Sequence, residues 1–258
     1  MINYLFTILV SVVAGCHASC YGAYKDSPLE SFLNKRYVRE LCFSFAIGVA
    51  FAFLRVWERE SYLLICLSTY ALSRIITEFY KLNIRVEPQG QFRIPTQIHF
   101  LGKVVHNRLL RILMGFVIPG VVFGVYMLSL HLPATLTAQY KGLVVGLIIG
   151  LADASGGAYK DGLIEGFYLK KFLKSPLLGS LGGFVISFKT TSPLFHLLGT
   201  IAFMRMFIEL LFKIICKKYV PGKFKSMEPV YHIWSKRRKI FLLPYSFTWL
   251  VCVALFFL

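Results

Sequence analysis

Charged side chains at a fixed spacing inside apolar stretches are the first candidates for chemistry in this sequence. Arg74 and Glu78 lie four residues apart in one such stretch, and Arg205 and Glu209 repeat the spacing in another. Residues four apart lie on one side of a helix, so each pair could form an ion pair. Charges within a membrane-spanning helix are costly and usually mark a substrate or ion pathway. A structural pair that locks the helix to its neighbour explains the pattern equally well.

A five-residue sequence, Gly-Ala-Tyr-Lys-Asp, occurs at residues 22–26 and again at residues 157–161. At this offset of 135 residues, matching acidic, aromatic and basic positions continue to residues 39 and 174. A second block of matches, at offsets of 131 to 133, joins Arg74 to Arg205, Glu78 to Glu209 and His99 to His232. This ordered series predicts an internal duplication, with a first repeat at 1–135 and a second at 136–258.

Asp153 breaks the symmetry of the predicted repeats, because the equivalent position in the first repeat is Ala18. The residue lies inside an apolar stretch, where an acidic side chain is expensive. We therefore expect Asp153 to take part in a pathway or site with a role performed by one repeat only.

Paired carboxylates follow both copies of the five-residue sequence. Asp26 and Glu30 are four residues apart, as are Asp161 and Glu165, so each pair could occupy one helix face. Such a pair could act as an acid and a base, and at Asp161 and Glu165 it could hold a divalent cation that bridges a phosphate. We predict no other metal or cofactor. We favour a helix start instead, with Ser27 as N-cap and Glu30 completing a capping box, because this explains the spacing without a ligand.

Basic residues gather around the same two segments. The stretches that follow the carboxylates are predicted to run along the membrane surface as amphipathic helices, which bind anionic headgroups through their basic side. General attraction to an anionic leaflet is favoured over a specific phosphate pocket as the explanation of these residues, because surface charge alone attracts them. The basic residues are Lys25, Lys35, Arg36, Arg39, Lys160, Lys170, Lys171 and Lys174.

The composition excludes a water-soluble domain and a disordered chain. Hydrophobic residues make up 57% of the 258 residues and charged residues 16%, against about 25% charged in soluble proteins. The net charge of +17 favours anionic lipids or a small anionic substrate as partners. Nucleic acid is not expected, because no recognition motif accompanies the charge.

Eight apolar stretches could cross a bilayer, which needs about 20 residues per helix. The sequence thus predicts an all-α, polytopic integral membrane protein of about eight transmembrane helices in two parallel four-helix repeats. Most basic residues then fall in loops on one side, which predicts that both termini lie on the non-cytoplasmic side. The short stretches 41–53 and 176–188 could instead be re-entrant. The eight stretches are 2–21, 41–53, 61–80, 112–130, 142–157, 176–188, 193–216 and 240–258.

Three classes of function remain open from the sequence. The first is a transporter or channel with its pathway between the repeats and an anionic or phosphate-bearing ligand, since duplicated helical bundles are common in such proteins. The second is a membrane-embedded enzyme that acts on a phospholipid or an isoprenoid phosphate. The third is a structural subunit that docks within an oligomer or complex.

Overall fold

The computed structural model describes residues 2–30, 32–86, 96–101, 103–216 and 232–258; within these ranges, the side chains of residues 27–30, 161 and 163–165 are not described.

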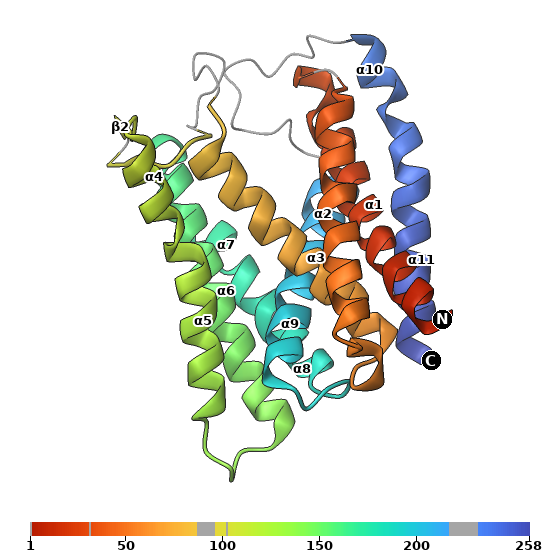
Figure 1. Ribbon diagram of the computed structural model, residues 1–258. Helices are drawn as coiled ribbons and strands as arrows, with labels where there is room; N and C mark the ends of the chain where they lie inside the picture. The colour runs from red at the N-terminus through yellow and green to blue at the C-terminus, as the bar shows by residue number, and fades with distance from the viewer. Residues whose placement is uncertain (1, 31, 87–95, 102, 217–231) are drawn as a thin grey trace. The chain divides into compact units, whose positions relative to one another are not determined.

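Long helices form nearly all the regular structure of the described residues (Figure 1). The first part of the chain contains α1 (Ile2–Glu30), α2 (Asn34–Phe53), the 3-10 turn η1 (Val56–Glu58), α3 (Tyr62–Phe79) and the π-helical segment η2 (Tyr80–Ile84). A two-stranded antiparallel sheet of β1 (His99–Phe100) and β2 (Lys103–Val104) precedes α4 (Arg108–Gly115) and α5 (Val117–Leu130).

The remaining elements follow the loop after α5. They are α6 (Ala138–Glu165), α7 (Leu169–Phe172), α8 (Lys174–Ile186), α9 (Pro193–Ile208), the π-helical segment η4 (Glu209–Ile215), α10 (His232–Arg237), the 3-10 segment η5 (Arg238–Phe241) and α11 (Leu242–Phe257).

Five helices in the described part of the chain are long and apolar enough to cross a membrane. They coincide with the first, third, fourth, fifth and eighth stretches that the sequence predicted. The predicted helical character is confirmed, and these helices are compatible with a membrane protein. Because α2, α8 and α9 are not among the five, the number of eight crossings stays a prediction. The five are Ile2–Asp26, Tyr62–Ile84, Arg108–Leu130, Ala138–Lys160 and His232–Phe257.

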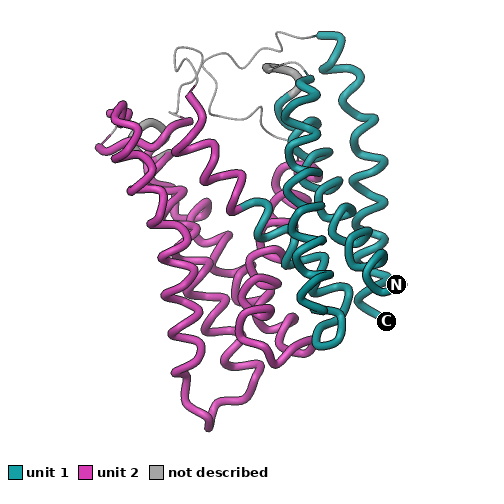
Figure 2. Tube along the Cα trace, in the orientation of Figure 1, with its two compact units in different colours: residues 1–74, 226–258 teal, residues 75–225 magenta. Residues whose placement is uncertain are grey.

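The chain divides into two compact units, coloured separately in Figure 2. Unit 1 comprises Met1–Arg74 and Ser226–Leu258, and unit 2 comprises Ile75–Lys225, so the division falls inside α3. Unit 1 is therefore discontinuous in sequence, and α1 begins and α11 ends at the same end of it (Figure 2). The units do not coincide with the predicted repeats 1–135 and 136–258, which were defined by sequence similarity alone.

Small residues bring α1 and α2 into close contact within unit 1. A Cβ atom added at Gly15 would lie 2.8 Å from Ser44 Cβ, and one at Gly48 would lie 2.6 Å from Ser11 Cβ. Small side chains at such positions let helix backbones approach closely in an apolar environment. Polar contacts hold two further helices against α1: Ser11 Oγ lies 3.1 Å from Thr69 Oγ1 of α3, and His17 Nδ1 lies 2.9 Å from Thr248 Oγ1 of α11.

Glycines bring α6 and α8 even closer within unit 2. A Cβ atom at Gly146 would collide with the carbonyl oxygen of Gly179, and one at Gly142 would collide with that of Gly183. His196 of α9 also contacts this seam, with Nε2 2.9 Å from the Gly183 carbonyl oxygen. Any larger side chain at these glycines would thus force α6 and α8 apart.

The predicted capping box is wrong, because α1 continues through Ser27 and Pro28 to Glu30. A proline inside a helix lacks the N–H that would bond one turn back and its ring crowds the carbonyl there, and α1 ends two residues after Pro28. In the second copy, α6 runs to Glu165 and is followed by Gly166, whose φ of 77° suits a glycine that ends a helix. Both acidic pairs therefore lie in the last turns of long helices.

The predicted surface helix is not a separate element in the first copy, whereas the short helix α7 is separate in the second. Lys35, Arg36 and Arg39 belong to the first turns of α2. Lys170 and Lys171 lie in the short helix α7, and Lys174 begins α8. In both copies, the basic residues that follow the acidic pair therefore lie at or just before the start of the next long helix.

Replacing Gly146 by alanine should lower the thermal unfolding temperature of the purified protein. The new Cβ must push α6 away from α8, and overpacking of this kind costs about 1–3 kcal/mol. Gly124→Ala is the matched control, since a Cβ there meets no atom within 4 Å and alanine favours the helix. Equal melting temperatures for the two variants would show that the α6–α8 contact is looser than described.

Candidate functional site

One carboxylate connects three helices in unit 2. Asp153, in α6, accepts a 2.8 Å hydrogen bond at Oδ2 from Ser175 Oγ in the first turn of α8. Its Oδ1 accepts from Arg205 Nη2 of α9, so the carboxylate and the guanidinium form an ion pair. The Asp153 side chain is 16% exposed and that of Arg205 46%. The structure thereby brings together two predicted site residues that are 52 residues apart in sequence.

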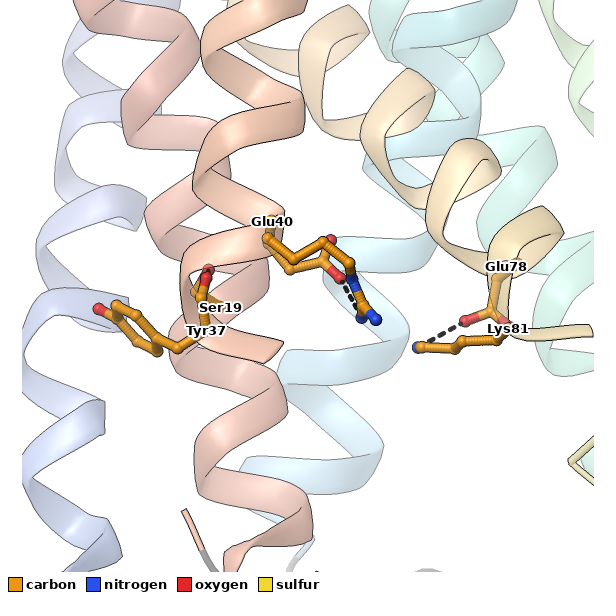
Figure 3. Close-up of polar contacts among 6 residues, drawn as sticks. Ser19, Tyr37, Glu40, Glu78 and Lys81 are labelled. Carbon is orange, nitrogen blue, oxygen red and sulfur yellow. Dashed lines mark hydrogen bonds and ion pairs between the residues drawn. The ribbon is translucent and has the colours of Figure 1, made fainter. Parts of the chain in front are cut away.

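Glu78 and Arg205, which belong to the two predicted arginine–glutamate pairs, each interact with a residue outside their own pair. Glu78 Oε1 accepts from Lys81 Nζ at 3.2 Å (Figure 3), while Arg205 binds Asp153. Glu209 is buried, with 5% of its surface exposed. The pathway role of Arg74, Glu78, Arg205, Glu209 and Asp153 stays a prediction.

Two π-helical segments follow the arginine–glutamate motifs. Segment η2 begins at Tyr80, two residues after Glu78, and η4 begins at Glu209 itself. A π-helical turn is rare and is found frequently at functional sites, because it widens the helix and redirects its side chains. No sequence signal other than the repeated spacing of polar residues could have indicated these segments.

The two copies of the five-residue sequence have different surroundings. In unit 1, Tyr24 is buried and its ring lies 4.8 Å from the Arg238 guanidinium, while Lys25 Nζ and Asp26 Oδ1 are 3.7 Å apart. In unit 2, Tyr159 is 46% exposed, and its hydroxyl donates to the His99 carbonyl oxygen at 3.1 Å. That hydroxyl also accepts from the Leu101 amide at 3.2 Å.

The predicted catalytic carboxylates fall largely outside the described side chains. Asp26 is described, but the side chains of Glu30, Asp161 and Glu165 are not. All four backbones lie in the last turns of α1 and α6, where the helix dipole disfavours negative charge. Helix stability therefore does not explain these acids. Among the described residues, no group of three or more His, Cys, Asp or Glu residues could hold a metal ion.

A cavity of about 290 Å³ lies in unit 2 beside the second copy of the five-residue sequence. Tyr159 and Lys160 line it together with His99. Gly156 also lines it from α6, and because it has no side chain it leaves space there. The other walls are mainly apolar and come from η2, the segment before β1, α4 and α5. These lining residues are Leu82, Asn83, Gln97, Ile98, Met114, Gly115, Val117 and Ile118.

The cavity combines an apolar recess with a cationic edge. Lys160 belongs to the predicted headgroup-binding residues, and it is half-buried where α6 approaches its end. His99 is buried at 5% exposure, and this desolvation, with the nearby Lys160 charge, lowers the pKa of its imidazole below the usual value. His99 is therefore neutral at physiological pH, and Lys160 supplies the positive charge.

Two polar residues escaped the sequence analysis. Glu40 is buried at 5% exposure in the second turn of α2, and its Oε1 accepts from Arg39 Nη2 at 3.0 Å (Figure 3). Ser175 is the serine that binds Asp153. Glu40 stands one residue before the apolar stretch 41–53, and Ser175 one residue before 176–188, so both had been excluded at a boundary.

No known family of proteins matches this sequence, and no curated protein or solved structure is significantly similar to it.

Removing the Asp153 carboxylate should destabilise unit 2 through Arg205. Asp153→Ala leaves the guanidinium without its partner on α6, whereas Asp153→Ala combined with Arg205→Leu removes both charges. We expect the double variant to unfold at a higher temperature than Asp153→Ala alone, with a coupling energy of about 0.5–1 kcal/mol, because solvent screens the partly exposed guanidinium. Additive losses in a double-mutant cycle would contradict an energetic link between the two side chains.

The stability of unit 2 should fall when the pH is lowered through the histidine range. Because the folded-state pKa of His99 lies below its usual value of about 6.5, the unfolded chain binds the proton more tightly. The stabilisation is present above pH 6.5 and is lost as the pH falls toward the folded-state pKa. His99→Gln should flatten the melting temperature between about pH 7.5 and 5.5. His106→Gln, at an exposed histidine, should leave that slope unchanged.

Proposed function

We propose that this chain is a duplicated membrane protein whose two repeats each contribute four helices. The helix boundaries support this proposal: an offset of 135 carries α6 onto residues 3–30, which is α1 without its first residue. The same offset carries α8 into α2, and an offset of 131 carries α9 onto residues 62–77, within α3. Each third helix continues into a π-helical segment.

The helix contacts repeat as well as the helix boundaries. The approach of Gly15 to Ser44 corresponds to that of Gly150 to Gly179, and Ser11 with Gly48 corresponds to Gly146 with Gly183. Shared seams at equivalent positions are expected if one ancestral helix pair was copied.

The fourth helices are exchanged between the proposed repeats. Unit 1 contains α11, the last helix of the second repeat, and unit 2 contains α5, the last helix of the first. Exchange of an equivalent element is the arrangement of a domain-swapped dimer. A duplicated gene that fused two swapped copies would give this pattern.

As the function of this protein, we propose transport of an anionic, phosphate-bearing amphiphile. The observation that carries the proposal is the cavity of unit 2, where Lys160 and His99, both in repeated blocks, meet apolar walls from η2, α4 and α5. Such a recess can receive part of a hydrocarbon chain while the lysine attracts the anionic group. In this proposal the charges within apolar stretches belong to the pathway, as intramembrane charges commonly do; they are Arg74, Glu78, Asp153, Arg205 and Glu209.

The two units differ at the position that opens the cavity. Gly156 of unit 2 corresponds to Tyr21 in unit 1, and Tyr21 is buried. The exposed Tyr159 corresponds to Tyr24, which Arg238 covers. We therefore assign the ligand site to unit 2, since aromatic and cationic side chains fill the corresponding place in unit 1.

An enzyme acting on a phospholipid or an isoprenoid phosphate is the second candidate. It is favoured by the acidic residues at the ends of α1 and α6, which oppose the helix dipole, and by the position of Asp161 directly after Lys160. Asp161→Asn with Glu165→Gln should then stop turnover of a labelled lipid phosphate, with or without added Mg²⁺ or Mn²⁺. Turnover at the wild-type rate in this variant would contradict the enzymatic function.

Replacing Gly156 by tyrosine should close the cavity and abolish ligand handling. A Cβ at Gly156 meets no atom within 4 Å, so the larger side chain fits the helix and enters the recess. We expect at least about a tenfold loss of binding of fluorescent phosphatidic acid in reconstituted vesicles, together with loss of its transbilayer flux.

Gly157→Tyr is the matched control, because a Cβ there is equally free and Gly157 does not line the cavity. Its binding and flux should equal those of the wild type. Unchanged binding in Gly156→Tyr would overturn the assignment of the site, and normal binding without any wild-type flux would overturn transport.

A further inference from the structure

Each unit has an arginine on its third helix and an acidic residue at one of the two equivalent positions on its first and second helices. The helix that carries this acidic residue differs between the two units. In unit 2 the acid is Asp153 of α6, which binds Ser175 of α8 and Arg205 of α9. In unit 1 the three equivalent positions hold Ala18 of α1, Glu40 of α2 and Arg74 of α3. In unit 1 the acidic residue is therefore on the second helix, at the position where unit 2 has its serine, and the first helix has alanine instead.

The packing brings these two acidic positions close together across the helix seam. In unit 2, a Cβ at Gly150 would collide with the Ser175 carbonyl oxygen; in unit 1, a Cβ at Gly15 would lie 3.2 Å from that of Glu40. The α1–α2 contact therefore has the register of the α6–α8 contact. An acidic side chain can reach the same region from either side of such a seam, and Glu40 is longer than the serine it replaces.

Glu40 is buried and ion-paired, which indicates that the fold requires a negative charge at this position. Its side chain is 6% exposed, it is held by Arg39 at 3.0 Å, and the Ala18 position opposite is buried. A carboxylate so far from solvent is retained only where cations balance it, and the half-buried Arg74 is the cation that the equivalent position of α3 supplies.

We propose that Glu40 is the unit 1 counterpart of Asp153: it neutralises Arg74 as Asp153 neutralises Arg205, with the acid transposed across the helix seam. Each unit then has one carboxylate–arginine centre built from its first three helices. Glu40 acts as a positioning residue that fixes α2 against α3. This inference does not depend on the transported ligand, because it concerns the charge balance of the fold.

The test moves the acid back to the position it occupies in unit 2. Glu40→Ser should lower the melting temperature of the purified protein by at least about 5 °C. Adding Ala18→Asp to Glu40→Ser recreates the arrangement of Asp153 and Ser175, and should recover at least about half of the loss. Glu58→Ser is the control, since Glu58 forms an exposed pair with Arg55 at 3.6 Å and should leave the melting temperature unchanged.

The reciprocal exchange in unit 2 keeps the test decisive if Glu40→Ser yields no folded protein. Ser175→Glu should then restore the folded yield and melting temperature of Asp153→Ala. Rescue in either unit supports the transposition. The inference is overturned if Glu40→Ser has the melting temperature of the wild type. It is also overturned if Ala18→Asp does not stabilise Glu40→Ser and Ser175→Glu does not stabilise Asp153→Ala.

Discussion

The close approach of two helix pairs is the constraint on which the other features depend. Gly146 and Gly179 bring the backbones of α6 and α8 together, and small residues do the same for α1 and α2. Only with the backbones this close can Ser175 reach Asp153 across the seam. The seam thus determines where a polar group on one helix can meet a charge on the next, and in unit 2 Arg205 of α9 adds its guanidinium at that position.

Hydropathy analysis predicted much of the helical framework. Long apolar runs such as 2–21 and 142–157 correspond to α1 and α6, because twenty apolar residues have few alternatives to a helix. The boundaries near polar residues were predicted poorly. A serine followed by proline at residues 27 and 28 has the local pattern of a helix start, yet the helix continues through it. Local rules cannot tell a helix start from a position near a helix end.

The candidate site was predicted only in part. Asp153 and Arg205 were identified as charges within apolar stretches, since any ionised group in such a stretch stands out. Their pairing was not, because it depends on how α6 and α9 pack. The cavity was equally hidden: Gly156 has no side chain to suggest a function, and its importance appears only beside Lys160 and His99. Glu40 was missed because its apolar run begins one residue later.

The discontinuity of unit 1 has a consequence for synthesis of the chain. Residues 1–74 are synthesised before unit 2, whereas α11, which packs against α1 through His17 and Thr248, is synthesised after it. Unit 2 is continuous and can be completed while unit 1 still lacks that helix. His17 of α1 can therefore meet Thr248 of α11 only after all of unit 2 has been synthesised.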